Sequence, residues 1–203
     1  MAPLFWVNSL SMSSRLVIFF DFETNGFAGS SVLEAALIKC RVNSEGEAIP
    51  IHIFHRYYHA EESFNMRAFE VHGLSPDIIE DNRMEQMAEY ARYFAKDEDL
   101  LVFSSGCSHW VAHNIDFDKD FLPFEPPRRF CTMRENTPVL RLPRRSHRGF
   151  KFPTLRETAL YYGLDYDESR AHNGLYDATL ARDIFLSMVK KKHAGALGFL
   201  SQM

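Results

Sequence analysis

The first chemical signal in the sequence is a pair of acids at the end of an apolar strand. The stretch VIFFDFETNG places Asp21 and Glu23 two positions apart, directly after four apolar residues. Side chains of a strand alternate between its faces, so both acids point to one side while Phe20 and Phe22 point to the other. Two carboxylates held this close repel each other and lose solvation unless something positive lies between them. The pair therefore predicts either a basic partner or a metal ion.

A second acidic cluster lies in HWVAHNIDFDKDFL, residues 109–122. A strand gives way there to a helix, and Asp116, Asp118 and Asp120 follow at alternate positions. Asp116 is suited to cap that helix, because its carboxylate can accept a hydrogen bond from a free N–H of the first turn. Taken alone, the cluster is better explained by decoration of a helix start than by a functional site.

The third cluster is AHNGLYDATLARD, residues 171–183, where His172 and Asp177 are five positions apart. On a continuous helix that spacing would separate the two side chains by roughly 140°. Gly174 between them indicates that His172 lies in the loop before the helix and Asp177 in its first turns, so both can approach one place. A solvated loop histidine is the alternative for His172.

Together the clusters supply four carboxylates and a histidine at strand ends and helix starts, where α/β sheets build their sites. Four carboxylates around one place do not remain ionised in an apolar sheet without cations. Carboxylate oxygens select hard divalent ions, chiefly Mg²⁺ or Mn²⁺. We therefore interpret Asp21 and Glu23 as metal ligands.

Hydrophobic periodicity and turn residues give the elements that must position these clusters. Three strands in a hairpin-like series, then helices alternating with strands, predict a mixed α/β sheet flanked by helices, with the first three strands antiparallel and the later ones parallel. The expected strands are Arg15–Asp21, Ser31–Arg41, Ile49–His59, His109–His113 and Arg129–Met133. The expected helices are Arg67–Gly73, Met84–Ala95, Phe117–Leu122, Thr154–Gly163 and Leu175–Lys192, with a loop up to Pro153 and either helix or strand over 100–103.

Size and composition indicate one packed domain. The chain has 203 residues, a hydrophobic fraction of 46% and 18 Phe, enough for a substantial core. We expect an N-terminal extension over 1–14, the domain over 15–192 and a C-terminal tail over 193–203. No apolar run is long enough to span a membrane. The odd number of cysteines without metal-site spacing favours reduced thiols in an intracellular protein.

The charge distribution is asymmetric. The net charge of −4 is unusual for a nucleic-acid binder, but residues 124–156 contain nine basic and two acidic groups, a net of +7, which leaves −11 elsewhere. Such a segment is typical of a phosphate-facing surface, and equally of a solvated loop.

The motifs DFETNG, VAHNIDFD and AHNGLYDA resemble, in order and spacing, those of the DnaQ-like exonuclease superfamily in its DEDDh branch. The stretches VHGLSPDII, FCTMR and FPTLRETALYYGL resemble connecting segments of the same proteins. The resemblance covers about residues 15–190 and implies a ribonuclease-H-like fold. It also implies 3′–5′ hydrolysis of nucleic acid, DNA in preference to RNA, to mononucleotides.

The resemblance assigns roles residue by residue. Asp21, Glu23, Asp118 and Asp177 would hold two ions of Mg²⁺, or of Mn²⁺ in its place, and His172 would be the general base. Asp118 is preferred to Asp116 because the motif's Phe–Asp pair falls on 117–118. Six further residues would contact the terminal nucleotide: Phe22, Thr24, Asn25, His72, Asn114 and Phe117. Asn25 stands where a second Thr is common, and Phe22 and Phe117 are explained equally well as core residues.

The implied partner is single-stranded or 3′-end nucleic acid, with a polymerase in trans as the partner of a proofreading role. Two other functions compete with hydrolysis. One is a nucleic-acid-binding module without chemistry, which usually lacks one of the acids or the histidine. The other is a haloacid-dehalogenase-type phosphotransferase, which requires an Asp where Glu23 stands and a distal Lys motif that the sequence lacks.

Overall fold

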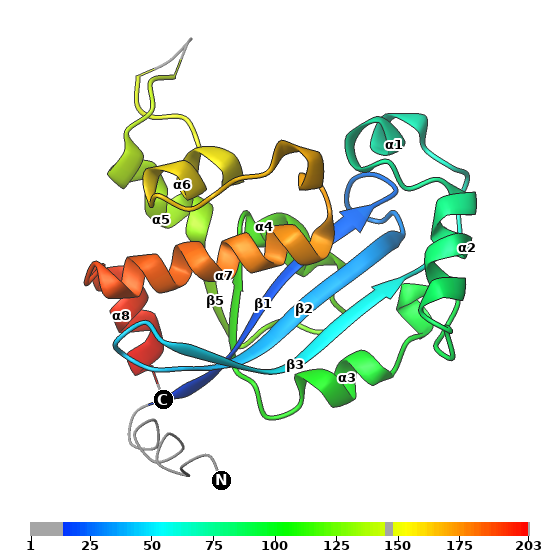
Figure 1. The fold of residues 1–203 in the computed structure, drawn as a ribbon, viewed down its shortest axis with the longest axis horizontal. Helices are drawn as coiled ribbons and strands as arrows, with labels where there is room; N and C mark the ends of the chain where they lie inside the picture. The colour runs from blue at the N-terminus through cyan, green and yellow to red at the C-terminus, as the bar shows by residue number, and fades with distance from the viewer. Residues whose placement is uncertain (1–13, 145–147, 203) are drawn as a thin grey trace, which may run out of the picture.

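The computed structural model describes residues 14–144 and 148–202 and contains a five-stranded sheet in the order β3-β2-β1-β4-β5 (Figure 1). The strands are β1 Arg15–Thr24, β2 Val32–Val42, β3 Ala48–Tyr57, β4 His109–Ala112 and β5 Arg128–Cys131. The first three strands pair antiparallel, and β4 and β5 run parallel to β1. The predicted mixed sheet is therefore confirmed. The expected extension over 1–14 lies, except for Ser14, outside the described residues.

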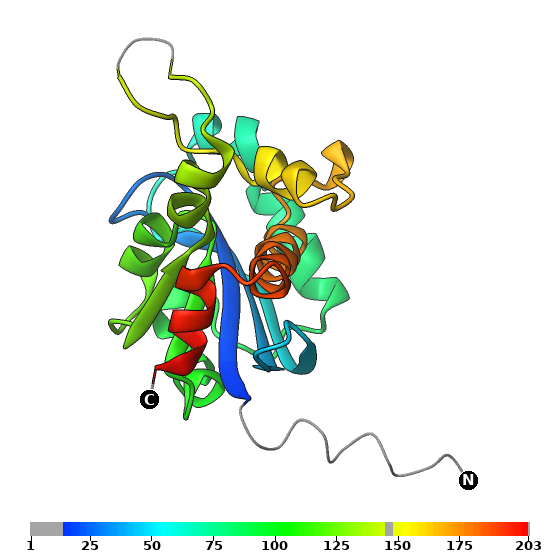
Figure 2. The same ribbon diagram turned by 90° about the vertical axis from the view of Figure 1, so that its left-hand side faces the viewer.

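Helices cover both faces of the sheet (Figures 1 and 2). They are α1 Met66–His72, α2 Pro76–Glu85, α3 Asp99–Ser104, α4 Ile115–Asp118, α5 Thr132–Leu140, α6 Leu155–Tyr161, α7 Gly174–Lys190 and α8 Ala194–Ser201. Three short 3₁₀ turns join them: η2 Phe94–Lys96, η3 Lys119–Phe121 and η4 Glu168–Arg170. Among the helices described, none is long and apolar enough to cross a membrane.

The alternation of β1 divides the core into two layers. Val17 and Phe19 pack on one face with α7, while Ile18 and Phe20 pack on the other face with Trp110. Because side chains alternate along a strand, Asp21 and Glu23 continue the series of Val17 and Phe19. The two acids therefore face α7.

The C-terminal segment belongs to the packed domain. Ala196, Phe199 and Leu200 of α8 are buried in the same core layer as α7, and the ring of Phe199 contacts Phe130 of β5. Burial of these apolar side chains stabilises the fold by the hydrophobic effect. The domain thus extends past residue 192, where the sequence analysis ended it.

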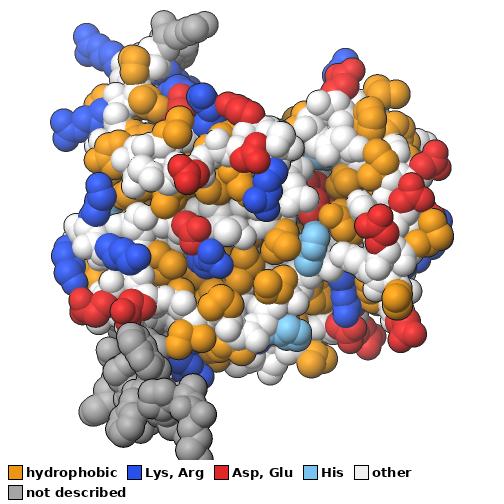
Figure 3. Space-filling model, in the orientation of Figure 1, with side chains coloured by type: hydrophobic (Ala, Val, Ile, Leu, Met, Phe, Trp, Pro, Cys, Tyr) orange, Lys and Arg blue, Asp and Glu red, His pale blue; other side chains and the backbone are white. Residues whose placement is uncertain are grey.

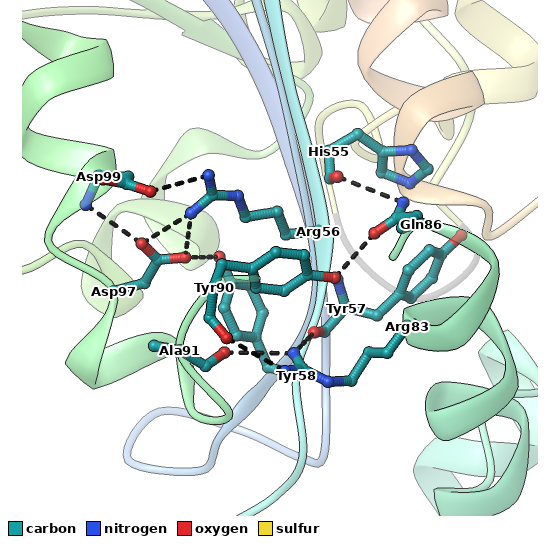
Figure 4. A network of polar contacts seen from close by, with 10 residues as sticks. All are labelled: His55, Arg56, Tyr57, Tyr58, Arg83, Gln86, Tyr90, Ala91, Asp97 and Asp99. Atoms are coloured by element: carbon teal, nitrogen blue, oxygen red, sulfur yellow. Dashed lines mark hydrogen bonds and ion pairs between the residues drawn. The ribbon is translucent and has the colours of Figure 1, made fainter. Parts of the chain in front are cut away.

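The helix predicted over Met84–Ala95 is wrong, because α2 ends at Glu85 and residues 87–93 form turns and bends. The apolar spacing of this segment predicted a helix, but the backbone carbonyl groups of Tyr90 and Ala91 bond to the side chain of Arg83. The buried guanidinium of Arg83 donates to the carbonyl oxygens of Tyr57, Tyr90 and Ala91 (Figure 4). This tertiary network outweighs the local helical preference.

The loop predicted up to Pro153 is also wrong in part, since it contains α5. Proline and basic residues argued against a helix, yet Pro138 lies inside α5. A contact with α6 stabilises the helix, because the buried side chain of Asn136 accepts a hydrogen bond at 2.7 Å from the hydroxyl of Tyr162, the C-cap residue of α6. The undecided segment 100–103 lies in α3, and the helix expected over 117–122 is α4 followed by η3.

Candidate active site

Strands β1 and β4 separate at one edge of the sheet, and the acids lie at that edge. Strand β1 pairs with β4 only as far as Phe19 opposite Val111. Beyond that point, the backbone N–H of Phe22 donates to Asp118 Oδ1 at 3.3 Å. The chain reaches this position through Asn114, whose φ of 76° turns it sharply from β4 into α4, a conformation that Asn tolerates better than most residues. Asp118 therefore lies beside the acids of β1.

The three acids of the second cluster have different partners. Asp118 is only 3% exposed and lies close enough to Asp21 and Glu23 to raise the pKa of both. Asp116 forms an ion pair with Arg134 of α5, and Asp120 pairs with Lys119. The geometry thus brings Asp118, and not Asp116, to the acids of β1.

The third cluster closes over the same edge. His172 adopts a φ of 61°, and its backbone N–H donates to Asp177 Oδ2 at 3.2 Å. The Asn173 side chain caps α7 by accepting from the N–H of Tyr176 at 3.0 Å. As a result, ligand atoms of Glu23, His172 and Asp177 lie within 4.8 Å of one another. The histidine is exposed in a loop and the aspartate is buried in the first helical turn, as the sequence analysis expected.

Burial raises the pKa of every acid in this group, and repulsion by the neighbouring acids adds to it for Asp21 and Glu23. For Asp21, burial is the main cause and Asp118 the next, and the pKa lies well above its ordinary value. Burial followed by the charge of Glu34 raises the pKa of Glu23 to about 9. Burial also raises the pKa of Asp118 to about 8 and that of Asp177 to about 7. The site therefore favours any state in which positive charge neutralises these groups.

The two explanations for the paired acids of β1 are now distinguishable. Among the described residues, no Lys or Arg forms an ion pair with Asp21, Glu23, Asp118 or Asp177, although ion pairs occur elsewhere on the surface. In addition, Asp177 Oδ1 is buried with no hydrogen-bond partner. An orphaned carboxylate oxygen beside three further carboxylates fits a hard divalent cation.

Glu34 of β2 is a fifth acid that the sequence analysis missed. It lies directly opposite Glu23 in the β1–β2 register and is 1% exposed. Its Oε1 lies 2.8 Å from Nε2 of His55, and after burial its charge is the next cause that raises the pKa of the Tyr57 hydroxyl. A single acid inside the apolar run VLEAALI was the available signal, since buried strands rarely contain an unpaired charge.

Three residues expected to contact the terminal nucleotide also make contacts within the protein, and two of them, Phe22 and Thr24, line the hollow beside Glu23. The ring of Phe22 packs in the core, 5.4 Å from Phe20 and 5.3 Å from Phe94. Thr24 donates its hydroxyl to the Gly26 carbonyl at 2.6 Å. The Asn25 amide donates to Glu62 and Ser63 and accepts from the backbone N–H of Asn65. These side chains shape the turn after β1.

Two of the other expected residues, His72 and Phe117, border an open hollow beside Glu23. His72 and Phe117 line this hollow of about 850 Å³, together with the exposed side chains of Phe27, Met66 and Val71. Nδ1 of His72 accepts from the N–H of Leu74 at 3.0 Å, which leaves Nε2 to donate to the carbonyl of Thr24. Asn114 shapes the turn into α4 instead and does not line the hollow.

Comparisons with known proteins agree with this fold. The family model described as Exonuclease (RNase_T) matches residues 18–185. Ribonuclease T of Citrobacter koseri is 24% identical over 185 residues, which cover 84% of this chain and 83% of that protein. Exonuclease X in complex with 5′-overhanging duplex DNA aligns with a TM-score of 0.58 and 20% identity, over 92% of this chain and 99% of that one. The zinc-bound complex of E. coli exonuclease I with single-stranded DNA aligns with a TM-score of 0.62 and 16% identity, over 90% of this chain and 42% of that one. The fold is the ribonuclease-H-like fold of these exonucleases, as predicted.

Proposed function

The chain belongs to the exonuclease family RNase_T, and on that premise we propose that it removes mononucleotides from the 3′ end of DNA by metal-dependent hydrolysis, with RNA as the alternative polymer. The observation that carries the proposal is the group of four acids, three buried and Asp21 half-buried, in which Asp177 Oδ1 has no hydrogen-bond partner. A binding module without chemistry has no need for such a costly arrangement.

Asp21, Glu23, Asp118 and Asp177 would hold Mg²⁺, or Mn²⁺ in its place. Divalent cations in such a site supply a Lewis acid for the phosphate and acidify a bound water. The protein's own contribution is to hold the four carboxylates together without a basic partner. No basic side chain among those described neutralises them, so they are available to divalent cations.

His172 is the proposed general base. Its exposed imidazole lies at the mouth of the acid group, with a ring nitrogen within 4.8 Å of carboxylate oxygens of Glu23 and Asp177. An imidazole nitrogen there can take the proton of the attacking water, a role usually worth about 10²–10⁴-fold in rate. We therefore expect the rate to fall at acid pH, where the imidazole is protonated. A rate that does not fall on the acid side of about pH 6 would rule out this role.

The hollow beside Glu23 is the proposed site of the terminal nucleotide. Phe27, Met66 and Val71 expose apolar side chains there, and a base can stack against such a wall whatever its identity. Glu23 at the floor then brings the phosphate next to the acids. This arrangement predicts cleavage with little dependence on base sequence.

The test uses two acids from the same helical turn. Asp118→Asn removes a proposed ligand, while Asp116→Asn removes a surface ion pair with Arg134. Single-stranded DNA and RNA labelled at the 5′ end are incubated with Mg²⁺, with Mn²⁺ or with chelator. We expect metal-dependent shortening from the 3′ end, reduced more than about 100-fold in Asp118→Asn and nearly unchanged in Asp116→Asn. Equal activity of the two variants would refute the ligand assignment, and absence of cleavage with retained binding would indicate a binding module.

A further inference from the structure

A basic hairpin rises from the edge of the sheet that carries the acids. It is defined here as residues 141–144 and 148–153, between the end of α5 and the start of α6. Pro143 and Phe150 form an antiparallel bridge, and the N–H of Lys151 donates to the Leu142 carbonyl at 3.0 Å. Figures 1 and 2 show both arms projecting beyond the body of the molecule.

The hairpin carries arginines that form no ion pair with the described acids, and exposed aromatic rings. Arg141, Arg144 and Arg148 are exposed, and no acid occurs between Asn136 and Arg156. Neighbouring basic residues do have acidic partners, for example Arg134 with Asp116 and Lys151 with Glu157, but none of the described acids pairs with these three arginines. Phe150 and Phe152 are 45% and 60% exposed. Arginines interleaved with exposed rings are typical of surfaces that bind nucleic acid.

The base of the hairpin is fixed to the proposed active site. Nε2 of His113 lies 3.1 Å from the Pro153 carbonyl, and its Nδ1 lies 2.9 Å from Oγ1 of Thr132. His113 immediately precedes the turn at Asn114 that positions Asp118. At the same end, Thr154 and Glu157 close a capping box at the start of α6. The hairpin therefore has a rigid base beside the acids.

The opposite flank of the site carries the opposite charge. Residues 61–99, called here the acidic lobe, contain 11 acidic and four basic residues, a net of −7. Figure 3 shows acidic side chains over α2 and basic side chains over the flank that bears the hairpin. A polyanion entering between the two flanks is repelled by the acidic lobe and attracted by the hairpin.

We infer that the basic hairpin binds the single-stranded part of the substrate upstream of the cleaved 3′ end, with its arginines on phosphates and its phenylalanines stacked on bases. This inference rests on the proposed function. Stacking requires bases that are not paired, so the exposed rings favour a single strand over a duplex. The arginines make the binding salt-dependent.

Two double variants test the inference, Arg144→Ala/Arg148→Ala and Phe150→Ala/Phe152→Ala. The control is Arg41→Ala, which removes an exposed arginine of β2 beside Leu16, at the far end of β1 from Asp21. Substrates are a single strand of about twenty nucleotides, longer than a typical single-strand site, a trinucleotide with the same 3′ end, and a blunt duplex. Binding of the labelled long strand is also measured by fluorescence anisotropy in chelator, so that it does not depend on cleavage.

We expect each double variant to raise KM for the long strand at least about fivefold, the lower bound for one stacked base, with kcat and trinucleotide cleavage unchanged. The arginine variant should also lower the slope of log K against log salt by about 1.4, for two phosphate contacts on a single strand. Unchanged binding and KM for the long strand would overturn the inference, as would an equal loss on the trinucleotide or a loss confined to the duplex. If the wild type cleaves nothing, the anisotropy still decides on the hairpin, and only the proposed function fails.

Discussion

Gly174 at the start of α7 is the position where a single methyl group should disturb the acid site. A Cβ added there would lie 3.1 Å from Cδ and 3.2 Å from Oε1 of Glu34, and 3.4 Å from Cβ of Ala36. Ordinary contacts between such atoms are about 3.5–4.0 Å, so something must move by a few tenths of an ångström. Glu34 is held by His55 at 2.8 Å, and Ala36 belongs to the sheet. The helix start therefore moves, and His172 and Asp177 move with it.

The size of the effect follows from two opposing contributions. Replacing Gly by Ala in a helix favours folding by up to about 1 kcal/mol, while overpacking a fixed core costs about 1–3 kcal/mol. The free energy of unfolding of Gly174→Ala should thus fall by up to about 3 kcal/mol. Activity is more sensitive, because a misplacement of about 1 Å can cost 10²-fold. A shift of a few tenths of an ångström should lower kcat about tenfold, which corresponds to about 1.4 kcal/mol.

Gly198→Ala in α8 is the matched control, because nothing lies within 4 Å of its added Cβ. This variant should gain about 0.5–1 kcal/mol in the free energy of unfolding and keep full activity. Urea denaturation and single-strand cleavage by the two variants measure both quantities. If Gly174→Ala is as active and as stabilised as Gly198→Ala, the seating of α7 on Glu34 does not set the site geometry.

Three further predictions concern stability. Without metal, the free energy of unfolding should fall as pH rises from about 4, the ordinary carboxyl value, to about 9, where Glu23 ionises. Acids with a raised pKa bind more protons in the folded state than in the unfolded state, so that stability is lost as the folded groups ionise. Urea denaturation in chelator at several pH values measures the free energy of unfolding, and a value that does not change with pH contradicts this prediction. Asn25→Ala should lower the free energy of unfolding by about 1 kcal/mol, because it removes the acceptor of the half-buried N–H of Asn65; an unchanged melting temperature would exclude this anchoring role. Arg83→Met should lower the free energy of unfolding by about 3 kcal/mol, because three hydrogen bonds to carbonyls are lost. The control, Arg92→Met at an exposed position, should lower it little, and thermal unfolding measures both variants.

Local patterns predicted the parts of the fold that depend on local physics. The alternation of β1 placed Asp21 and Glu23 on one face and Phe20 and Phe22 on the other, as the two core layers show. The helix over 154–163 was predictable because Thr154 caps it and Gly163, with a φ of 72°, ends it. Family membership likewise confirms the resemblance to DnaQ-like exonucleases, which rested on motif order.

The errors occur where distant residues decide the local structure. The Arg83 network (Figure 4) joins α2 to carbonyls up to eight positions away and to β3, and no periodicity reports such bonds. Glu34 escaped notice because its partners His55 and Tyr57 lie on another strand. The side chain of Asn25 bonds to Glu62 and Asn65, which only the folded chain brings to it, and its contact with the substrate stays a prediction.

The raised pKa values of the site bear on how its pH dependence is to be interpreted. With the pKa of Glu23 at about 9 and that of Asp118 at about 8, the acids share protons at neutral pH and must release them to hold cations. Two processes therefore lower activity at acid pH, protonation of His172 and competition between protons and metal for the acids. They differ in one respect, because only the competition depends on metal concentration. An acid limb that moves to lower pH as Mg²⁺ is raised belongs to the carboxylates, whereas a limb that stays fixed at saturating Mg²⁺ and disappears in His172→Asn belongs to the histidine.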